Sequence, residues 1–280
     1  MWGQPPSAVR RATPGSLFAT VEIMPRIAIP MPHSFDTEYA ERAIPQYEHA
    51  VALAGGEPVR IPLDQTTDEI IKSMERCDGV LLPGSKADID PARFNAARSP
   101  HAAAADPQRD VVDDLLLEYA YRFRKPVLGI CYGLQSLNVY RAGSLIQHIP
   151  DFLPEETRAK VNHEAGKNVA VAHAVEIEPG SKLAEIVAAD GRSSTSEVVR
   201  RSIVLPVNSS HHQSADAIGD GLRIVARCPD DGIIEALEGT ARDHFVLGVQ
   251  WHPERSVNED AASRAIFRAL IDAAAKRPRD

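Results

Sequence analysis

The most informative stretch of the chain is Pro126-Val127-Leu128-Gly129-Ile130-Cys131-Tyr132-Gly133-Leu134-Gln135. Its first half is a short apolar run typical of a buried strand, and residues 134–140 follow a helical pattern. Between them lies a Gly-x-Cys-x-Gly turn, whose glycines permit the sharp strand-to-helix bend that projects a central side chain. The stretch therefore predicts a nucleophile elbow centred on Cys131. The alternative is a buried structural cysteine beside glycines that serve packing.

A candidate base for a cysteine nucleophile lies in the later segment Val249-Gln250-Trp251-His252-Pro253-Glu254. A histidine at a strand end can take the thiol proton, and a carboxylate two residues later can accept a hydrogen bond from the other ring nitrogen. This spacing predicts His252 as the general base and Glu254 as the residue that orients it. Taken alone, the segment leaves open that His252 is an ordinary surface or hydrogen-bonded histidine.

The first half of the chain alternates short β-rich runs with longer helical runs. This order predicts an α/β fold, in which helices cover a mostly parallel sheet. The predicted strands are Arg26–Pro30, Pro58–Leu63, Gly79–Leu82 and Val127–Cys131. The predicted helices are Tyr47–Ala54, Glu69–Met74 and Asp110–Phe123, and Asp88–Gln108 is expected to be an irregular loop. The acidic residues within 110–118 are expected to form a solvated helix face.

The second half of the chain, after about residue 142, is richer in β structure. Its predicted strands are Ser144–Ile149, Val169–Ile177, Ile203–Val207, Leu222–Ala226, Ile233–Leu237 and Val246–Gln250. Asn258 is expected to cap a final helix that carries one apolar stripe from Ala262 to Ala273. Residues 24–276 are therefore expected to form a single domain. Residues 1–23, which are rich in proline and glycine, are expected to be a flexible tail.

The composition is that of an ordinary globular protein, since 44% of the 280 residues are apolar and 25% are charged. The net charge is -8 and no long basic run occurs, so neither nucleic acid nor an anionic membrane is expected as a partner. No stretch approaches the roughly 20 apolar residues that a membrane span requires. Cys77, Cys131 and Cys228 are widely spaced, which favours a reducing, cytoplasmic location.

Together, the cysteine elbow and the late His-x-Glu resemble the class I glutamine amidotransferase superfamily, whose members carry both on a flavodoxin-like, doubly wound sheet. The chain is more closely similar to the peptidase C26 family of gamma-glutamyl hydrolases, which includes gamma-glutamyl-gamma-aminobutyrate hydrolase. Further segments match this family in order. They are Tyr47–Pro62, Leu81-Leu82-Pro83-Gly84, Asp88-Ile89-Asp90-Pro91, Gln135–Ile149 and Val207-Asn208-Ser209-Ser210-His211-His212-Gln213. The resemblance covers about residues 25 to 272.

The resemblance implies a hydrolase that cleaves gamma-glutamyl amide bonds through a glutamyl thioester. Cys131 is then the nucleophile, His252 the general base and Glu254 its orienting partner. This chemistry needs no metal and no organic cofactor, and the partner is a small gamma-glutamyl substrate whose leaving group stays open. Two alternatives remain: a glutaminase subunit that delivers ammonia to a separate synthase, and a non-enzymatic binding module on the same fold. A homodimer is compatible with the sequence.

The resemblance also implies an oxyanion hole made by the backbone N–H groups of Tyr132 and of Gly84 or Ser85. Two of these positions depart from the family pattern. Gly84-Ser85 stands where the loop often reads Gly-Gly, and a serine there is strained if the loop needs a positive φ. Tyr132 stands where many gamma-glutamyl-gamma-aminobutyrate hydrolases have arginine, which weakens the assignment of the leaving group.

The same family comparison implies that Gln135, His211, His212 and Gln213 border the substrate pocket, near the glutamyl group. Loop capping is the alternative role for this segment. A metal site at the adjacent histidines is not expected, because neighbouring side chains diverge and no carboxylate or cysteine follows at a ligand spacing. The resemblance also places His163 in a segment that leads to the substrate pocket, with a solvated loop histidine as the alternative.

Overall fold

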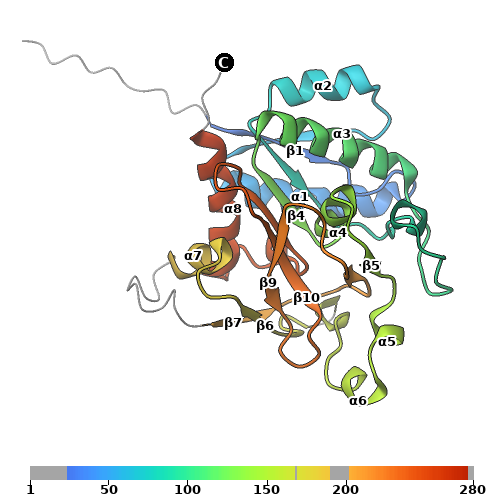
Figure 1. Ribbon diagram of the computed structural model, residues 1–280. Helices are drawn as coiled ribbons and strands as arrows, with labels where there is room; N and C mark the ends of the chain where they lie inside the picture. The colour runs from blue at the N-terminus through green and yellow to red at the C-terminus, as the bar shows by residue number, and fades with distance from the viewer. Residues whose placement is uncertain (1–23, 168, 190–201, 277–280) are drawn as a thin grey trace, which may run out of the picture.

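The computed structural model describes residues 24–167, 169–189 and 202–276. The expected flexible tail, residues 1–23, lies outside these ranges. Within them, a sheet runs through the middle of the molecule and helices cover both of its faces (Figure 1). The predicted α/β class is therefore confirmed.

One side of the sheet is parallel, as the alternating pattern predicted. Its strands in spatial order are β2 (Glu57–Ile61), β1 (Arg26–Pro30), β3 (Gly79–Leu82), β4 (Val127–Ile130) and β11 (Val246–Val249). Every residue of β3, β4 and β11 is buried, which explains why these strands read as continuous apolar runs. The last strand of the chain, β11, thus lies next to β4, with Val249 paired to Ile130.

The other side of the sheet is antiparallel and comes from the β-rich second half of the chain. Beyond β11 follow β10 (Ile234–Gly239), β9 (Leu222–Arg227), β6 (His173–Ile177) and β7 (Ile203–Val207), so that nine strands of the described ranges form one sheet. A separate pair is formed by β5 (Leu145–Ile146) and β8 (Ser214–Ala215). Two predicted strands are shorter than expected. The predicted strand Val169–Ile177 begins only at His173. The predicted strand Ser144–Ile149 ends at Ile146, before the short helix α5 (Ile149–Phe152).

Two apolar cores lie on opposite faces of the sheet. One face is covered by α1 (Thr37–Leu53), α7 (Lys182–Ala189) and α8 (Ala261–Ala275). The other is covered by α2 (Thr67–Glu75), α3 (Pro107–Phe123) and α4 (Tyr132–Tyr140), and Figure 1 shows α2 and α3 side by side. The short helix α6 (Glu155–Arg158) follows α5. None of the helices in the described ranges has the length and apolar character needed to span a bilayer.

Side-chain caps place the starts of three helices differently from the sequence prediction. Helix α1 begins ten residues early because Asp36 accepts a hydrogen bond from the Tyr39 N–H, and it continues through Pro45. Helix α3 begins after the cap Asp106. The predicted cap of α8 is wrong: Asp260 accepts from the Ser263 N–H, whereas the side chain of Asn258 contacts His49.

The carboxyl ends of β3, β4 and β11 lie next to one another at one edge of the sheet. Ligand sites of α/β proteins form at this edge, because the loops that follow parallel strands converge there. The chain places Gly84 after β3, Cys131 after β4 and His252 after β11. The fold thus gathers the predicted catalytic segments from three separate parts of the sequence.

Candidate active site

Cys131 lies in the sharp turn between β4 and α4, with the unusual backbone angles φ 53° and ψ -106°. A non-glycine residue rarely adopts a positive φ, and such strain is held only where the surrounding structure enforces it. The flanking glycines allow the turn: a Cβ on Gly129 would lie 2.6 Å from the Gly133 carbonyl oxygen, and a Cβ on Gly133 would lie 2.2 Å from that of Leu82. The local geometry is therefore that of a nucleophile elbow.

His252 follows β11 and is buried beside Cys131, at the start of a short turn of 3-10 helix, Pro253–Arg255. Its Nδ1–H donates to Glu254 Oε1 at 2.7 Å, so the opposite nitrogen, Nε2, is available for proton transfer. Asn208 fixes the backbone of this histidine from both sides: its Nδ2 donates to the His252 carbonyl at 2.8 Å, and its Oδ1 accepts from the His252 N–H at 3.0 Å. No role for Asn208 was predicted from the sequence.

The charges in this site favour an imidazolium. Burial alone disfavours the charged ring, but attraction by Glu254 and Cys131 outweighs it and raises the pKa of His252 to about 9. Burial also opposes the Glu254 carboxylate, yet the attraction of His252 keeps the pKa of Glu254 below its ordinary value. A hydrogen bond between His252 and Cys131 contributes to the same balance. Both members of the His252–Glu254 pair are therefore charged at neutral pH.

The loop after β3 packs closely against these residues. A Cβ on Gly84 would lie 3.0 Å from His252 Cε1 and 3.6 Å from Cys131 Cβ, so a larger residue would displace the ring. The Gly84 N–H donates to the Tyr47 hydroxyl at 3.0 Å. Ser85 is not among the described non-glycine residues with a positive φ, so the expected strain at this serine is absent.

Tyr132, the residue after the nucleophile, has a buried side chain that belongs to the core and not to the solvent. Its hydroxyl donates to Asp110 Oδ1 at 2.6 Å, and its ring packs under the guanidinium of Arg109 at 4.8 Å. Burial, followed by the charge of Asp110, raises the pKa of Tyr132 well above its ordinary value. The expectation that the acidic residues of 110–118 form a solvated face is therefore wrong for Asp110 and Asp113, which are buried.

Arg109 is a fully buried residue that the sequence analysis did not single out. Its Nε donates to Asp113 Oδ1 at 2.6 Å, and its two terminal nitrogens donate to the carbonyls of Pro32 and Pro83 at 3.1 and 2.8 Å. The second of these carbonyls directly precedes the loop at Gly84. Arg109 therefore fixes the position of that loop, and its i,i+4 spacing from Asp113 is the sequence signal that could have indicated the pair.

A cavity of about 510 Å³ opens over Cys131 and His252. The four predicted substrate-binding residues all line it: Gln135, His211, His212 and Gln213. A further hollow of about 570 Å³ lies between α1, α7 and α8, but none of the candidate catalytic residues borders it. The smaller cavity is therefore the one that the chemistry can use.

The lining side chains differ in their roles. Gln135 Nε2 donates to the Gln213 carbonyl at 3.2 Å and to Gln250 Oε1 at 3.3 Å, which ties α4 to the loop before β8. His212 Nε2 contacts Asp88 Oδ2 at 3.0 Å. His211 turns the other way, and its Nε2 lies 3.4 Å from the buried carboxylate of Glu235. The adjacent histidines diverge, as expected.

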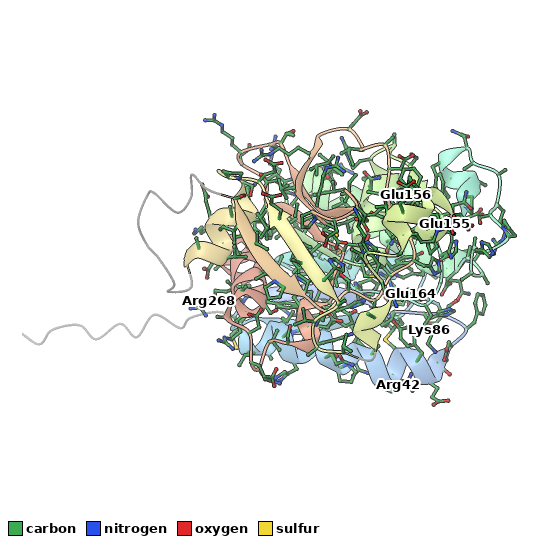
Figure 2. All side chains as sticks on the ribbon, turned by 90° about the horizontal axis from the view of Figure 1, so that it is seen from below. Arg42, Lys86, Glu155, Glu156, Glu164 and Arg268 are labelled. Carbon is green, nitrogen blue, oxygen red and sulfur yellow. The ribbon has the colours of Figure 1, made fainter. Side chains whose placement is uncertain are left out.

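Charged side chains surround the mouth of the cavity. Arg42, Lys86 and Arg255 supply positive charge, and Asp88 and Glu164 supply negative charge. Figure 2 shows Arg42, Lys86 and Glu164 on the same side of the molecule. Lys86 also pairs with Asp36 at 2.8 Å, and Arg255 lies 3.5 Å from Glu254. The arrangement suits a small substrate that carries both a carboxylate and an ammonium group.

Comparisons with known proteins place this architecture in a family. The model of the peptidase C26 family matches residues 22–254. The gamma-glutamyl-gamma-aminobutyrate hydrolase PuuD of Escherichia coli (strain K12) is 32% identical over 238 residues, which cover 81% of this chain and 84% of that protein. A protein of Rickettsia prowazekii (strain Madrid E) named as glutamine amidotransferase-like is 31% identical over 249 residues, which cover 81% and 87% of the two chains.

A solved structure shows the same fold. The glutaminase domain of Trypanosoma brucei CTPS with bound acivicin has a TM-score of 0.58 to this chain at 19% identity, over 91% of this chain and 95% of that one. This likeness supports the flavodoxin-like sheet predicted from the sequence. Since the family model spans most of the described residues and relatives exceed 30% identity over most of their length, the chain belongs to the peptidase C26 family.

Proposed function

We propose that the chain is a cysteine-dependent hydrolase that cleaves gamma-glutamyl amide bonds through a glutamyl thioester. Family membership and the relatives named gamma-glutamyl-gamma-aminobutyrate hydrolase support an amide-bond hydrolase. The observation that carries the finer proposal is that a strained Cys131 and His252 line one cavity, with Glu254 hydrogen-bonded to His252. A nucleophile, a base and an orienting carboxylate are the groups that acyl transfer requires.

In the first step, the thiolate of Cys131 attacks the side-chain amide carbon of the glutamyl group. The imidazolium of His252 gives its proton to the amine as the C–N bond breaks, which leaves a thioester and a free amine. In the second step, water attacks the thioester carbon and His252 takes a proton from this water. The C–S bond then breaks, glutamate leaves and the thiolate is restored.

Backbone N–H groups stabilise the oxyanion that forms in both steps. The Gly84 N–H is engaged by Tyr47. Ser85 and Tyr132 line the cavity with Cys131 and supply the two N–H donors in this proposal. Each such donor is commonly worth about 3 to 4 kcal/mol of transition-state stabilisation, because it is fixed in place before the charge develops.

The charges at the cavity mouth define the substrate end that is recognised. In this proposal the α-carboxylate of the glutamyl group binds among Arg42, Lys86 and Arg255, and its α-ammonium faces Glu164. A carboxylate on the leaving amine, as in a gamma-glutamyl amino acid, would meet the same positive region. Neutral amides without an α-carboxylate are therefore expected to be poor substrates.

The test uses gamma-glutamyl-p-nitroanilide and the variant Cys131→Ala, with Cys77→Ala as a matched control at a buried cysteine outside the site. Wild type and the control should release p-nitroaniline, and Cys131→Ala should release none. Hydroxylamine added during turnover of the wild type should yield glutamyl hydroxamate, the product of an intercepted thioester. Wild-type turnover by Cys131→Ala would exclude the mechanism.

The relative named as glutamine amidotransferase-like favours a second candidate, a glutaminase that serves a synthase. The same assay separates the two, because a free hydrolase turns over gamma-glutamyl amides without a partner. A chain that is silent on all gamma-glutamyl amides, yet is labelled at Cys131 by a glutamate-like electrophile, would favour the dependent glutaminase. An unreactive Cys131 would favour a binding module without catalysis.

A further inference from the structure

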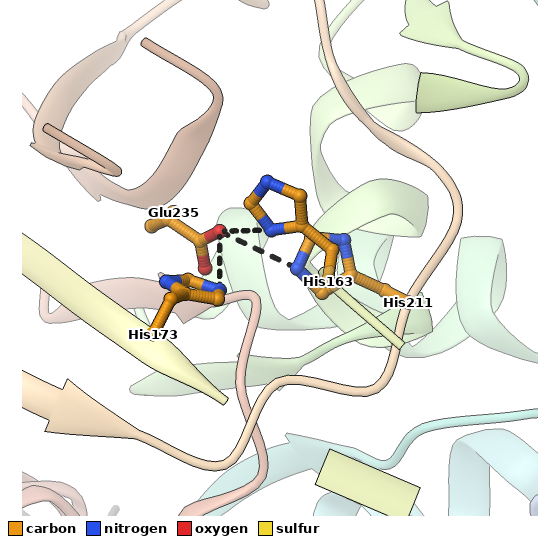
Figure 3. Close-up of side chains that lie close together, drawn as sticks. All are labelled: His163, His173, His211 and Glu235. Carbon is orange, nitrogen blue, oxygen red and sulfur yellow. Dashed lines mark ion pairs between the residues drawn. The ribbon is translucent and has the colours of Figure 1, made fainter. Parts of the chain in front are cut away.

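Four ionisable side chains converge in the antiparallel part of the fold, next to the cavity but outside the catalytic trio. They are His163 from the loop after α6, His173 from β6, His211 from the loop between β7 and β8, and Glu235 from β10, here called the histidine–glutamate cluster. Figure 3 shows the three imidazole rings around the Glu235 carboxylate. All four residues are buried, with Glu235 at 0% exposure. Segments far apart in the sequence thus supply one buried polar centre.

The three distances from the Glu235 carboxylate to the imidazole nitrogens match edges of a tetrahedral metal site. Glu235 Oε1 lies 3.1 Å from His163 Nδ1, 3.4 Å from His173 Nε2 and 3.4 Å from His211 Nε2. Zinc binds imidazole nitrogen and carboxylate oxygen at about 2.0 to 2.2 Å, which places tetrahedral ligands about 3.3 to 3.5 Å apart. All four candidate ligand atoms lie within 4.8 Å of one another.

The opposite nitrogen of each ring is held by an acceptor. His163 Nε2 donates to Asp231 Oδ2 at 2.8 Å, His173 Nδ1 to the Ala174 carbonyl at 3.0 Å, and His211 Nδ1 to the Gln213 carbonyl at 2.9 Å. Since these acceptors require a proton on that nitrogen, each neutral ring directs its lone pair toward Glu235. Metal-binding histidines are oriented in the same way, by a carboxylate or carbonyl on the other nitrogen.

The inward-facing nitrogens of the three rings and the two Glu235 oxygens have no hydrogen-bond partner outside the cluster among the described residues. Buried lone pairs and a buried carboxylate that face one another are costly unless a metal cation lies between them or one ring carries a second proton. A divalent cation with three neutral imidazoles, Glu235 and Asp231, whose side chain is 0% exposed, gives a net charge of zero, so the low-dielectric interior tolerates the assembly.

We infer that the histidine–glutamate cluster is a closed, four-coordinate site for a divalent transition metal, with Zn²⁺ as the best fit. Three imidazole nitrogens exclude the oxygen-seeking ions Mg²⁺ and Ca²⁺, and a tetrahedral N3O set suits zinc. Burial of all four ligands leaves no open position for a substrate, so the role is structural. This inference does not rest on the proposed chemistry of Cys131.

The metal would fix one wall of the catalytic cavity. His211 is followed by His212 and Gln213, which line that cavity, and its backbone N–H donates to the His163 carbonyl at 3.0 Å. Three residues before His211, Asn208 holds the backbone of His252. One loop therefore connects the histidine–glutamate cluster to the general base, and loss of the metal should loosen both the cavity wall and His252.

The first experiment measures the metal content of the full chain, purified without a polyhistidine tag and dialysed after addition of one equivalent of ZnCl2. Mass spectrometry of the elements should find about one zinc per chain in wild type and at least about tenfold less in His173→Gln. His244→Gln is a control at a buried histidine outside the cluster, and Cys228→Ser tests the neighbouring set His163, Cys228 and Asp231. Both controls, and Cys131→Ala, should keep their zinc.

A second experiment keeps all four proposed metal ligands. It therefore tests the zinc site even if His173→Gln does not fold. Competition with a chromophoric chelator should show zinc affinity about 10- to 100-fold lower in Asp231→Asn than in wild type, because only the residue behind His163 is changed. Co²⁺ in the wild type should give visible absorption bands of a four-coordinate site, and Zn²⁺ should abolish them.

A wild type that retains less than about a tenth of an equivalent of zinc after reconstitution overturns the inference. Zinc loss in Cys228→Ser with full retention in His173→Gln also overturns it.

Discussion

Tyr47 and Gly84 are joined by a buried hydrogen bond, in which the Gly84 N–H donates to the Tyr47 hydroxyl at 3.0 Å. Burial, reinforced by the charge of Glu254, raises the pKa of Tyr47 well above its ordinary value, so the hydroxyl stays neutral. The bond links α1 to the loop that packs against His252. It also occupies an N–H group that the family resemblance offered for the oxyanion hole.

Tyr47→Phe removes the acceptor and leaves the Gly84 N–H buried without a partner. We expect the free energy of unfolding to fall by about 1 to 3 kcal/mol, the usual cost of an unsatisfied buried donor. The rate constant kcat should change little, because this N–H is not one of the proposed oxyanion donors. Urea unfolding and steady-state kinetics on a gamma-glutamyl anilide check both expectations. A large loss of kcat in a stable variant would assign Gly84 a direct role.

Ser85→Pro removes one of the proposed oxyanion donors, since proline has no backbone N–H. We expect kcat to fall by about 10²- to 10³-fold while KM changes much less, because the donor acts mainly in the transition state. Ser85→Ala is the matched control, since it keeps the N–H and loses only the side-chain contact to the Ala87 N–H. Equal activity of the proline and alanine variants, with both folded by circular dichroism, would exclude the Ser85 N–H as a donor.

Glu254→Gln removes the charge that favours the imidazolium of His252. The pKa of this histidine, about 9 in the intact site, should fall, so the alkaline limb of the pH–rate profile should move to lower pH. The rate at the optimum should drop by about 10²-fold or more, in the range of general acid–base effects. Glu259→Gln, at an exposed position nearby, should leave the profile unchanged.

The His252–Glu254 pair also predicts how the free energy of unfolding depends on pH. The folded-state pKa of His252 lies above its ordinary value of 6.5, so its contribution to stability is complete below pH 6.5 and is lost as the pH rises through 9. Wild type should therefore lose unfolding free energy over this window, and Glu254→Gln should lose less. Chemical unfolding at pH 6, 7.5 and 9.5, compared between the two proteins, measures the difference. Parallel pH curves for the two proteins would contradict the assigned pair.

Arg109→Met leaves the Asp113 carboxylate buried without its partner. We expect a loss of about 3 to 5 kcal/mol in the free energy of unfolding, the usual cost of breaking a buried ion pair from one side. The double variant Arg109→Met, Asp113→Leu should recover most of this stability, because neither charge of this buried ion pair is left. Its activity should stay low, because the anchor on the Pro83 carbonyl remains absent. Full recovery of kcat in the double variant would show that Arg109 does not position the loop.

The sequence was most informative where structure is set locally. The Gly-x-Cys-x-Gly turn predicted the elbow because a tight strand-to-helix turn is set by a few neighbouring residues, as the close approach of Gly129 to the Gly133 carbonyl shows. The buried parallel strands were found for a similar reason, since both of their faces must be apolar. Strand and helix ends were less accurate. Helix α1 begins at a side-chain cap, Asp36, and runs through Pro45, a residue that usually predicts a break.

The residues that support the site could not be ranked from the sequence, because their roles depend on contacts between distant segments. Asn208 reaches His252, and Arg109 reaches Pro32, only once the sheet is complete. A signal for the histidine–glutamate cluster did exist. Glu235 and Glu238 are charged residues in the buried strand β10, and each such residue needs a buried partner. The partners of Glu235, however, lie in three other segments that no local pattern connects.

The pairing of β4 with β11 affects when a reactive thiol can arise during folding. Cys131 follows β4, and His252 follows β11, more than about 110 residues later, so the two meet only after a very long segment has closed. A nascent or partly folded chain that has not yet added β11 carries Cys131 without its base. Under the proposed mechanism, activation of the nucleophile is thus coupled to completion of the sheet.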